Sequence, residues 1–341
     1  MSKRLTIAGL SIVGGFGQGK QSLLDALHTG GKPNASLPVA GNSASRNLPA
    51  YQADVSGVTK YVSAASARRM NRFAKLGLLG ASLAVEDAGL AIPVKRNDIG
   101  LVIASGFGAS KSTFDFLDTM IDNNGEFPSP TMFSNSVHSS AASHISISLD
   151  LQGPCLTVSQ FEMSSISALL TAYNWLAESR VKTVILGAVE ELCPVLAYCY
   201  DRFFGDNANG PIEPFVWEKQ SAVMGEGAAF LVLTLDNEKS RYGCIDRFQW
   251  AQTGKADIPK DKLLVLGADG HTCCAKDYQK LSEGVNSKIA YSPVYGSLPG
   301  GQLFDVVIGL SVKPADKFTS VKCDMDGNCG VIECHFHRES S

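Results

Sequence analysis

The chain has 341 residues, of which 45% are hydrophobic and only 18% charged, and it carries a net charge of −3. Soluble proteins average about 25% charged residues, so this composition predicts an extensive buried surface, as in a large core with a subunit interface. The lack of a basic excess excludes functions that depend on nucleic-acid binding. No apolar stretch reaches the length of a transmembrane helix, so we expect no membrane span and a cytoplasmic location.

Short β-rich runs alternate with amphipathic helical runs over much of the chain. The helix Ala65–Gly89 is the clearest prediction, because its apolar residues recur at helical spacing and a glycine ends it. This alternation predicts a largely parallel sheet with helices on both faces. The other predicted strands are Leu5–Val13, Asp98–Ala104, Leu156–Ser159, Thr183–Ala188 and Glu226–Leu235, and the other predicted helices are Ser112–Asn123 and Ser164–Ser179.

The last third of the chain repeats this rhythm in a looser form. No low-complexity linker separates it from the first part, so we predict two similar α/β halves packed together, residues 1–235 and 236–341. Its predicted strands are Cys244–Gln252, Lys262–Gly267 and two strands within Thr319–His337, and its predicted helices are Ala275–Gly284 and Gly300–Val312.

A glycine-rich segment after the first predicted strand resembles a phosphate-binding loop. Residues 14–21 follow the P-loop spacing as far as Gln21, where a Ser or Thr must hold magnesium. The glycines Gly15, Gly17 and Gly19 have the wrong last spacing for a dinucleotide-binding turn. We therefore expect a tight loop and no cofactor, with nucleotide binding kept as an alternative hypothesis.

Nine cysteines, an odd count, occur without a visible secretion signal, so a disulfide framework is not expected. A C-terminal run of cysteines and histidines suggests zinc, but it lacks any CxxC pair. The adjacent Cys273 and Cys274 would point to opposite faces of a strand. We expect no metal site. The C-terminal run consists of Cys323, Cys329, Cys334, His335 and His337.

The most informative segment is Gly153–Leu170, where a predicted strand runs into a sharp turn and then a helix rich in small residues. The helix N-terminus stabilises an anion, so a cysteine in this turn would be an activated thiolate. The turn instead holds Glu162. An acidic residue in the first turn of a helix is also an ordinary structural feature, so this position alone does not decide the function.

Several segments, in order along the chain, resemble the β-ketoacyl synthases of the thiolase fold. Together they cover about residues 1–235, and their order is more specific than any one of them. The segments are Arg68–Phe73, which looks like the arginine-rich helix start; Asp98–Gly108, a strand with its following glycines; Ser129–His144, the interface loop and helix; Gly153–Ser159, the strand before the active-site elbow; and Pro214–Phe215 with Met224–Ala228, the late signature.

This resemblance carries over three catalytic positions. The family elbow reads T-A-C-[AS]-S, and its cysteine falls on Glu162. The family's two histidines lie in motifs of the form H-G-T-x-T-P-x-x-D and G-H-x-x-G-A-A-G. Residues 269–277 and 296–301 resemble these motifs and put Asp269 and Ser297 at the histidine positions. His271, two positions away, stays open as a displaced equivalent.

The resemblance implies an α/β, thiolase-like fold, with two similar βαβ-rich halves in a layered α-β-α-β-α core and a shortened second half. Condensation needs a thiol as acyl carrier and two histidines to stabilise developing negative charge. Because all three are missing, the resemblance narrows to the family's inactive members, the chain-length factors, and suggests those of bacterial aryl polyene clusters. These subunits heterodimerise with a catalytic ketosynthase, shape its elongation tunnel and meet the acyl carrier protein indirectly.

The resemblance also implies where such a subunit acts. Three consecutive residues of the interface loop would reach across the dimer, and one apolar face of the helix Ser112–Asn123 would line the tunnel. Simple core packing is an open alternative for that face. The loop residues are Thr131, Met132 and Phe133, and the helix residues are Phe114, Leu117 and Met120.

The competing hypothesis is an active condensing enzyme or acyltransferase with a displaced nucleophile. Cys155, Cys273 and Ser164 are the candidates for that nucleophile.

Overall fold

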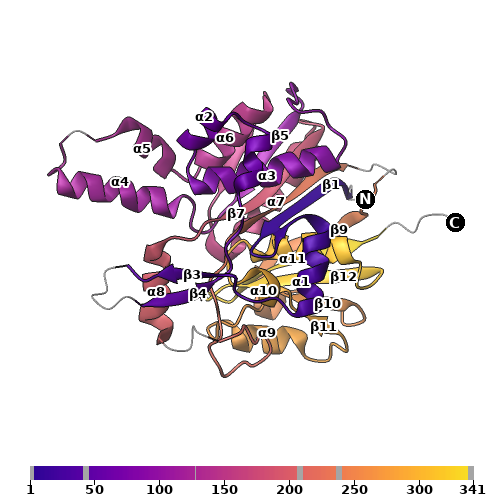
Figure 1. The fold of residues 1–341 in the computed structure, drawn as a ribbon. Helices are drawn as coiled ribbons and strands as arrows, with labels where there is room; N and C mark the ends of the chain where they lie inside the picture. The colour runs from indigo at the N-terminus through magenta and orange to yellow at the C-terminus, as the bar shows by residue number, and fades with distance from the viewer. Residues whose placement is uncertain (1–3, 41–45, 127, 206–209, 236–239, 337–341) are drawn as a thin grey trace.

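The computed structural model describes residues 4–40, 46–126, 128–205, 210–235 and 240–336. Its main feature is one long mixed sheet (Figure 1). The N-terminal half of the sheet has the strand order β1 (Leu5–Gly14), β8 (Gly227–Leu235), β7 (Thr183–Glu190), β5 (Ile99–Ala104) and β6 (Cys155–Val158). The C-terminal half has the order β9 (Cys244–Gln252), β13 (Asn328–His335), β12 (Lys317–Cys323), β10 (Leu263–Leu266) and β11 (Lys288–Ile289).

The two halves of the sheet repeat one topology. β5 pairs in parallel with β6 and β7, and β10 pairs in parallel with β11 and β12. β8 runs antiparallel between β7 and β1, and β13 runs antiparallel between β12 and β9. β1 and β9 join the halves through the pair Thr6–Cys244 and its neighbour. Two similar halves are therefore present in the strand topology, and the division at residue 235 stays a prediction.

The two halves of the sheet form two layers, and helices between and outside them form three more. This five-layer arrangement confirms the thiolase-like α/β fold. α7 (Ser164–Ala177) and α11 (Gly301–Val312) pack in the centre, in one apolar cluster with both halves of the sheet. α3 (Arg72–Asp87) and α6 (Ser140–Leu149) cover the outer face of the N-terminal half. α9 (Ala275–Ser282) covers the outer face of the C-terminal half (Figure 1).

The second half has shorter connections between its strands, and the one between β9 and β10 bears on the surface described next. β1 connects to β5 through the helix α3, whereas the described chain between β9 and β10 contains only the 3-10 turn η4 (Thr253–Lys255). Where a second copy of α3 would pack, the outer face of the sheet carries ion pairs instead of apolar side chains. Arg247 bonds Asp257 at 2.8 Å, and Lys262 bonds Glu333 at 2.7 Å.

The prediction of one continuous helix over Ala65–Gly89 was wrong. The chain forms α2 (Ala64–Arg69) and α3, separated by the extended residues Met70 and Asn71. Asn71 caps α3, because its side chain accepts a hydrogen bond from the Ala74 backbone N–H at 2.7 Å. Apolar periodicity continues through this break, and so it concealed the cap.

The remaining elements lie around this core. The glycine-rich segment forms a tight hairpin, in which Gly14 pairs with Gly17, and then enters the first helix. None of the described helices is long and apolar enough to cross a membrane. The elements are α1 (Gly19–Thr29), α4 (Ser110–Asp122), α5 (Pro130–Ser136), α8 (Pro194–Phe204), α10 (Ser292–Tyr295), β2 (Gly17–Gln18), β3 (Ala35–Pro38), β4 (Asn47–Ala50), and the 3-10 turns η1 (Ser56–Lys60) and η2 (Phe161–Met163).

Candidate functional site

A cavity of about 480 Å³ lies where the loops of the two halves meet. Its lining comes from the turn after β5, the elbow before α7, the helix α8, the loop before α9 and the β12–β13 hairpin. Most of the lining is apolar. The charged and polar lining residues used below are Glu162, Tyr200, Gln220, Asp269, His271, Cys273 and Lys322.

The elbow has the geometry that the sequence predicts. β6 ends at Val158, and η2 turns the chain directly into α7. Phe161 adopts a left-handed backbone conformation with φ of 45°, which is uncommon for a non-glycine residue. The Ser164 hydroxyl holds the turn by accepting from the Gln160 N–H at 2.8 Å and donating to the Ser105 carbonyl at 3.2 Å. These contacts present Glu162 to the cavity.

Glu162 occupies an electrostatically mixed position. Burial raises the pKa of its carboxyl above the ordinary value, and the negative charge of Asp269 acts in the same direction. The Lys322 ammonium opposes both effects. The elbow therefore holds an acidic group within the field of a buried cation, and no thiol.

The other two carried-over positions are in direct contact. Asp269 Oδ2 accepts hydrogen bonds from Ser297 Oγ at 3.0 Å and from Lys322 Nζ at 2.8 Å. Burial alone would raise the pKa of Asp269, but the positive charge of Lys322 lowers it below the ordinary value. Against the opposing effect of burial, Asp269 in turn raises the pKa of Lys322 well above its ordinary value. Asp269 thus forms a buried ion pair with Lys322, a residue that sequence analysis missed, and Ser297 donates a hydrogen bond to the same carboxylate oxygen.

A chain of hydrogen bonds leads from His271 to this ion pair. His271 Nδ1 lies 3.0 Å from Gln220 Nε2, a donor, which leaves the imidazole proton on Nε2. That nitrogen lies 3.3 Å from Tyr200 Oη, and the Tyr200 hydroxyl donates to Ser297 at 3.2 Å. Burial lowers the pKa of His271, which favours this neutral form. His271 therefore lines the cavity but bonds other side chains within it.

The three candidate nucleophiles differ in access to the cavity. Cys155 lies on β6 and is outside the cavity lining, and Ser164 is buried with its hydroxyl bonded to the backbone. Cys273 lines the cavity, and a hydrogen bond from Cys274 lowers the pKa of its thiol. Our expectation that the two adjacent cysteines point apart was wrong. They lie in a turn rather than a strand, with their sulfur atoms 3.7 Å apart.

The residues expected at an interface lie on a projecting arm made of α4 and α5 (Figure 1). None of the α4 residues is buried, which rules out simple core packing within this chain. Phe116 and Phe133 hold the two helices together, with ring centroids 5.6 Å apart. Of the predicted residues, Phe114, Leu117, Thr131 and Phe133 are exposed, and Met120 and Met132 are half-buried.

Two segments that carried the resemblance support each other in the structure. Arg72, in the arginine-rich segment, forms an ion pair with Glu226 of the late signature, whose side chain is fully buried. Glu190, which sequence analysis missed, ends β7 beneath the cavity. It accepts from the N–H groups of Gly106 at 2.6 Å and Gly300 at 3.2 Å. Burial raises the pKa of Glu190 to about 7.

Comparisons with known proteins agree with this architecture. The model of the β-ketoacyl synthase N-terminal domain matches residues 2–239. A 3-oxoacyl-[acyl-carrier-protein] synthase 2 of Synechocystis is 25% identical over 240 residues, which are 68% of this chain and 57% of that protein. The chain spans less than two thirds of the length of the first curated relatives that it matches.

Solved structures extend the similarity in fold to nearly the whole chain. The ishigamide ketosynthase/chain length factor has a TM-score of 0.76 at 16% identity, covering 98% of this chain and 100% of that one. A β-ketoacyl synthase from Burkholderia phymatum has a TM-score of 0.79 at 17% identity, with the same coverage. The fold is thus that of the thiolase-like condensing enzymes. This chain belongs to the β-ketoacyl synthase family.

Proposed function

We propose that this chain is a non-catalytic subunit of the chain-length-factor type. It pairs with a catalytic β-ketoacyl-ACP synthase and shapes the tunnel in which an acyl or polyene chain grows. The observation that carries the proposal is the elbow, where Glu162 lines the cavity at the position that condensation reserves for a thiol.

The chemistry of the cavity supports this proposal. A carboxylate does not replace a thiol as the thioester-forming acyl carrier, and its charge repels a developing oxyanion. An oxyanion also needs hydrogen-bond donors aimed at it. Here Lys322 Nζ and Ser297 Oγ both donate to Asp269. The donors beside the elbow are therefore already engaged by an anion of the chain itself.

Exposed surface beside the elbow fits a partner subunit. β6 is the last strand at its end of the sheet, and an uncovered strand edge is a template for pairing with another chain. Leu156 on β6 is 42% exposed, Ile147 on α6 is 79% exposed and Phe133 on the arm is 57% exposed. We infer that a homologous, cysteine-bearing subunit covers this surface. The cysteine and the two histidines of the assembly belong to that partner.

Co-expression with a cysteine-bearing homologue tests the pairing. We expect a 1:1 complex by size-exclusion chromatography with light scattering. Ile147→Asp and Phe133→Asp should each weaken it at least tenfold, since each buries a charge in an apolar contact. Trp250→Asp is the matched control, because Trp250 is an exposed aromatic residue on the distant strand β9. A stable homodimer with condensing activity would contradict the proposal.

A second candidate function is acyl transfer through Cys273. Its support is the position of this thiol in the cavity lining and its lowered pKa. Incubation of the purified chain with an acyl thioester, followed by intact-mass measurement, separates the two functions. No adduct is expected for a chain-length factor. A stable adduct that Cys273→Ser removes and Cys155→Ser retains would favour the second candidate.

Four finer assignments belong to the same proposal. The shortened second half suggests a chain-length factor of a bacterial aryl polyene cluster. The acyl carrier protein would dock on the catalytic partner and meet this chain only indirectly. The complex would act in the cytoplasm, and the two thiolase-like halves would divide at residue 235.

A further inference from the structure

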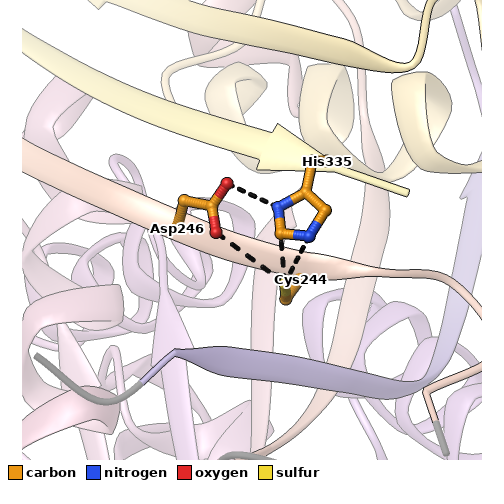
Figure 2. A group of neighbouring side chains, drawn as sticks. All are labelled: Cys244, Asp246 and His335. Carbon is orange, nitrogen blue, oxygen red and sulfur yellow. Dashed lines mark hydrogen bonds and ion pairs between the residues drawn. The ribbon is translucent and has the colours of Figure 1, made fainter. Parts of the chain in front are cut away.

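Three side chains with metal-binding groups meet on the outer face of the sheet, two from one strand and the third from a strand much later in the chain. They are Cys244 and Asp246 of β9 and His335 of β13 (Figure 2). Cys244 Sγ lies 3.5 Å from His335 Nδ1 and 3.3 Å from Nε2. Asp246 Oδ1 lies 3.9 Å from the sulfur, and Oδ2 lies 2.5 Å from Nδ1. One ligand atom from each residue lies within 4.8 Å of the other two.

A β-bulge brings these side chains together. Glu333 pairs with Arg247, but the next residue of β13 pairs with Ile245, which leaves Asp246 as an extra residue on β9. A bulge interrupts the alternation of side chains between the two faces of a strand. Asp246 can therefore share the outer face with Cys244 and with His335, which is directly opposite Cys244 in the ladder.

The N-terminal half provides an internal comparison. β1 and β8 occupy the places of β9 and β13, and β1 has a register shift at the equivalent point, where Ala8 is the extra residue. Thr6 and Thr234 are the pair that corresponds to Cys244 and His335. Their hydroxyls lie 3.1 Å apart. The same backbone thus works with Thr, Ala and Thr, so the fold itself does not require a thiol, a carboxylate and an imidazole here.

We propose that Cys244, Asp246 and His335 bind one zinc-type divalent transition-metal ion, with water as the fourth ligand. Thiolate, imidazole and carboxylate are the three ligand types that zinc uses. In a tetrahedral site, ligand atoms about 2.0–2.3 Å from the ion lie about 3.3–3.8 Å from one another. The observed sulfur–nitrogen distance of 3.5 Å lies within this range. The carboxylate faces the sulfur with Oδ1, at 3.9 Å, and His335 Nδ1 with Oδ2, so it must turn to present one oxygen to the ion.

The ion would take the place of the proton between His335 Nδ1 and Asp246. That gap must widen from 2.5 Å to about 3.3 Å through rotation of the Asp246 side chain, which is 29% exposed. The Cys244 thiol loses its proton to solvent on binding. The Arg4 side chain is 61% exposed, and its Nε lies 3.2 Å from Asp246 Oδ1.

Burial favours metal binding over cysteine catalysis for this cluster. Cysteine, histidine and aspartate at these distances also resemble a nucleophile with its base. Cys244, however, is only 1% exposed, so a substrate cannot reach the sulfur, whereas an ion needs only one open side. The bound ion would tie β9 to β13 where the second half lacks a covering helix. This site was not expected from sequence, because its cysteine lies about 90 residues before its histidine.

Zinc titration of the full chain, after removal of metals with a chelator, tests the proposal. We expect one zinc equivalent by dialysis and elemental analysis. Cobalt substitution should give the near-ultraviolet absorption of a cobalt–thiolate bond. Cys244→Ser and His335→Gln should each weaken zinc binding at least tenfold and remove the cobalt–thiolate band or shift it. Zinc should raise the melting temperature of the wild type but not of these variants.

Cys329→Ser is the matched control, because Cys329 is another buried cysteine on the outer face of β13. It should keep the zinc equivalent and the cobalt band. Asp246→Asn, a nearly isosteric change, gives a further folded variant with a lost ligand charge. Absence of a stoichiometric site in the wild type, or unchanged zinc affinity in Cys244→Ser, would overturn the proposal. The outcome does not depend on the proposed pairing with a ketosynthase.

Discussion

Replacement of Lys322 by methionine perturbs the charge cluster that fills the cavity. The Lys322 side chain is 3% exposed, and its Nζ donates to Asp269 at 2.8 Å and to the Gly267 carbonyl at 3.0 Å. Without this cation, Asp269 becomes an uncompensated buried charge, and Glu162 loses the group that holds its pKa down. Breaking a buried ion pair in this way costs about 3–5 kcal/mol of unfolding free energy.

Denaturant unfolding of the purified chain measures this loss as a lower midpoint at an unchanged slope. Adding Asp269→Asn removes both charges and should recover most of the loss, because the amide oxygen still accepts from Ser297. Lys317→Met, at an exposed position on the same strand, should change stability by about 0.5 kcal/mol or less. A loss under about 1 kcal/mol for Lys322→Met, or a double variant no more stable than the single one, refutes the reasoning.

We expect the stability that the Asp269–Lys322 ion pair provides to be lost in two pH ranges, one acidic and one alkaline. The pKa of Asp269 is lowered, so its stabilising contribution is present above the unfolded carboxyl value of 3.8 and is lost as the pH falls below it. The pKa of Lys322 is raised, so its contribution is present below 10.5 and is lost as the pH rises beyond that value. Unfolding midpoints across pH should show the acid loss in the wild type, and Asp269→Asn should make it smaller, because other carboxyls with lowered pKa values still contribute.

Two further predictions concern the buried Arg72–Glu226 ion pair and the interface arm. Arg72→Met leaves the fully buried Glu226 without its cation and should cost about 3–5 kcal/mol by denaturant unfolding, whereas Arg69→Met, at an exposed neighbouring position, should have little effect. Phe114→Ala and Met120→Ala should lengthen the product of the catalytic partner, because each removes volume from the arm that we place at the tunnel. Product analysis by mass spectrometry checks this, and an unchanged distribution from both variants would remove that role.

The strongly patterned elements were predictable from sequence. The helix predicted at Gly300–Val312 is observed at Gly301–Val312, and the one predicted at Ser112–Asn123 is observed at Ser110–Asp122. These segments combine a regular apolar pattern with clear ends. The elbow was predictable for another reason, since a strand, a sharp turn and a small-residue helix follow one another without interruption at Glu162.

The contacts of Lys322 and of the proposed metal site depend on how the strands pair, and the local pattern of apolar and polar residues does not give this register. Lys322 has the same parity along β12 as Phe318, whose ring lies in the central core, so its side chain points inward. Only the pairing of β12 within the sheet shows which of its alternate residues face the central core. The proposed metal site was still harder to predict, because it also depends on a β-bulge: a single extra residue in β9 places Asp246 beside His335. Contacts between distant strands therefore remained hidden.

Glu162→Cys tests whether a thiol at the elbow is enough for condensing chemistry in this chain. The new thiol would lie at the elbow, where the Lys322 ammonium favours a thiolate but burial and Asp269 oppose it, so we expect slow acylation by an acyl thioester and a mass increase. Glu162→Ser, which lacks the thiol, should give no adduct. Condensation should still be about 10²–10³-fold below that of the catalytic partner, because Asp269 already accepts from Lys322 and Ser297. Efficient condensation would show that Lys322 and Ser297 can be released from Asp269, and that Glu162 alone accounts for the proposed lack of condensing activity.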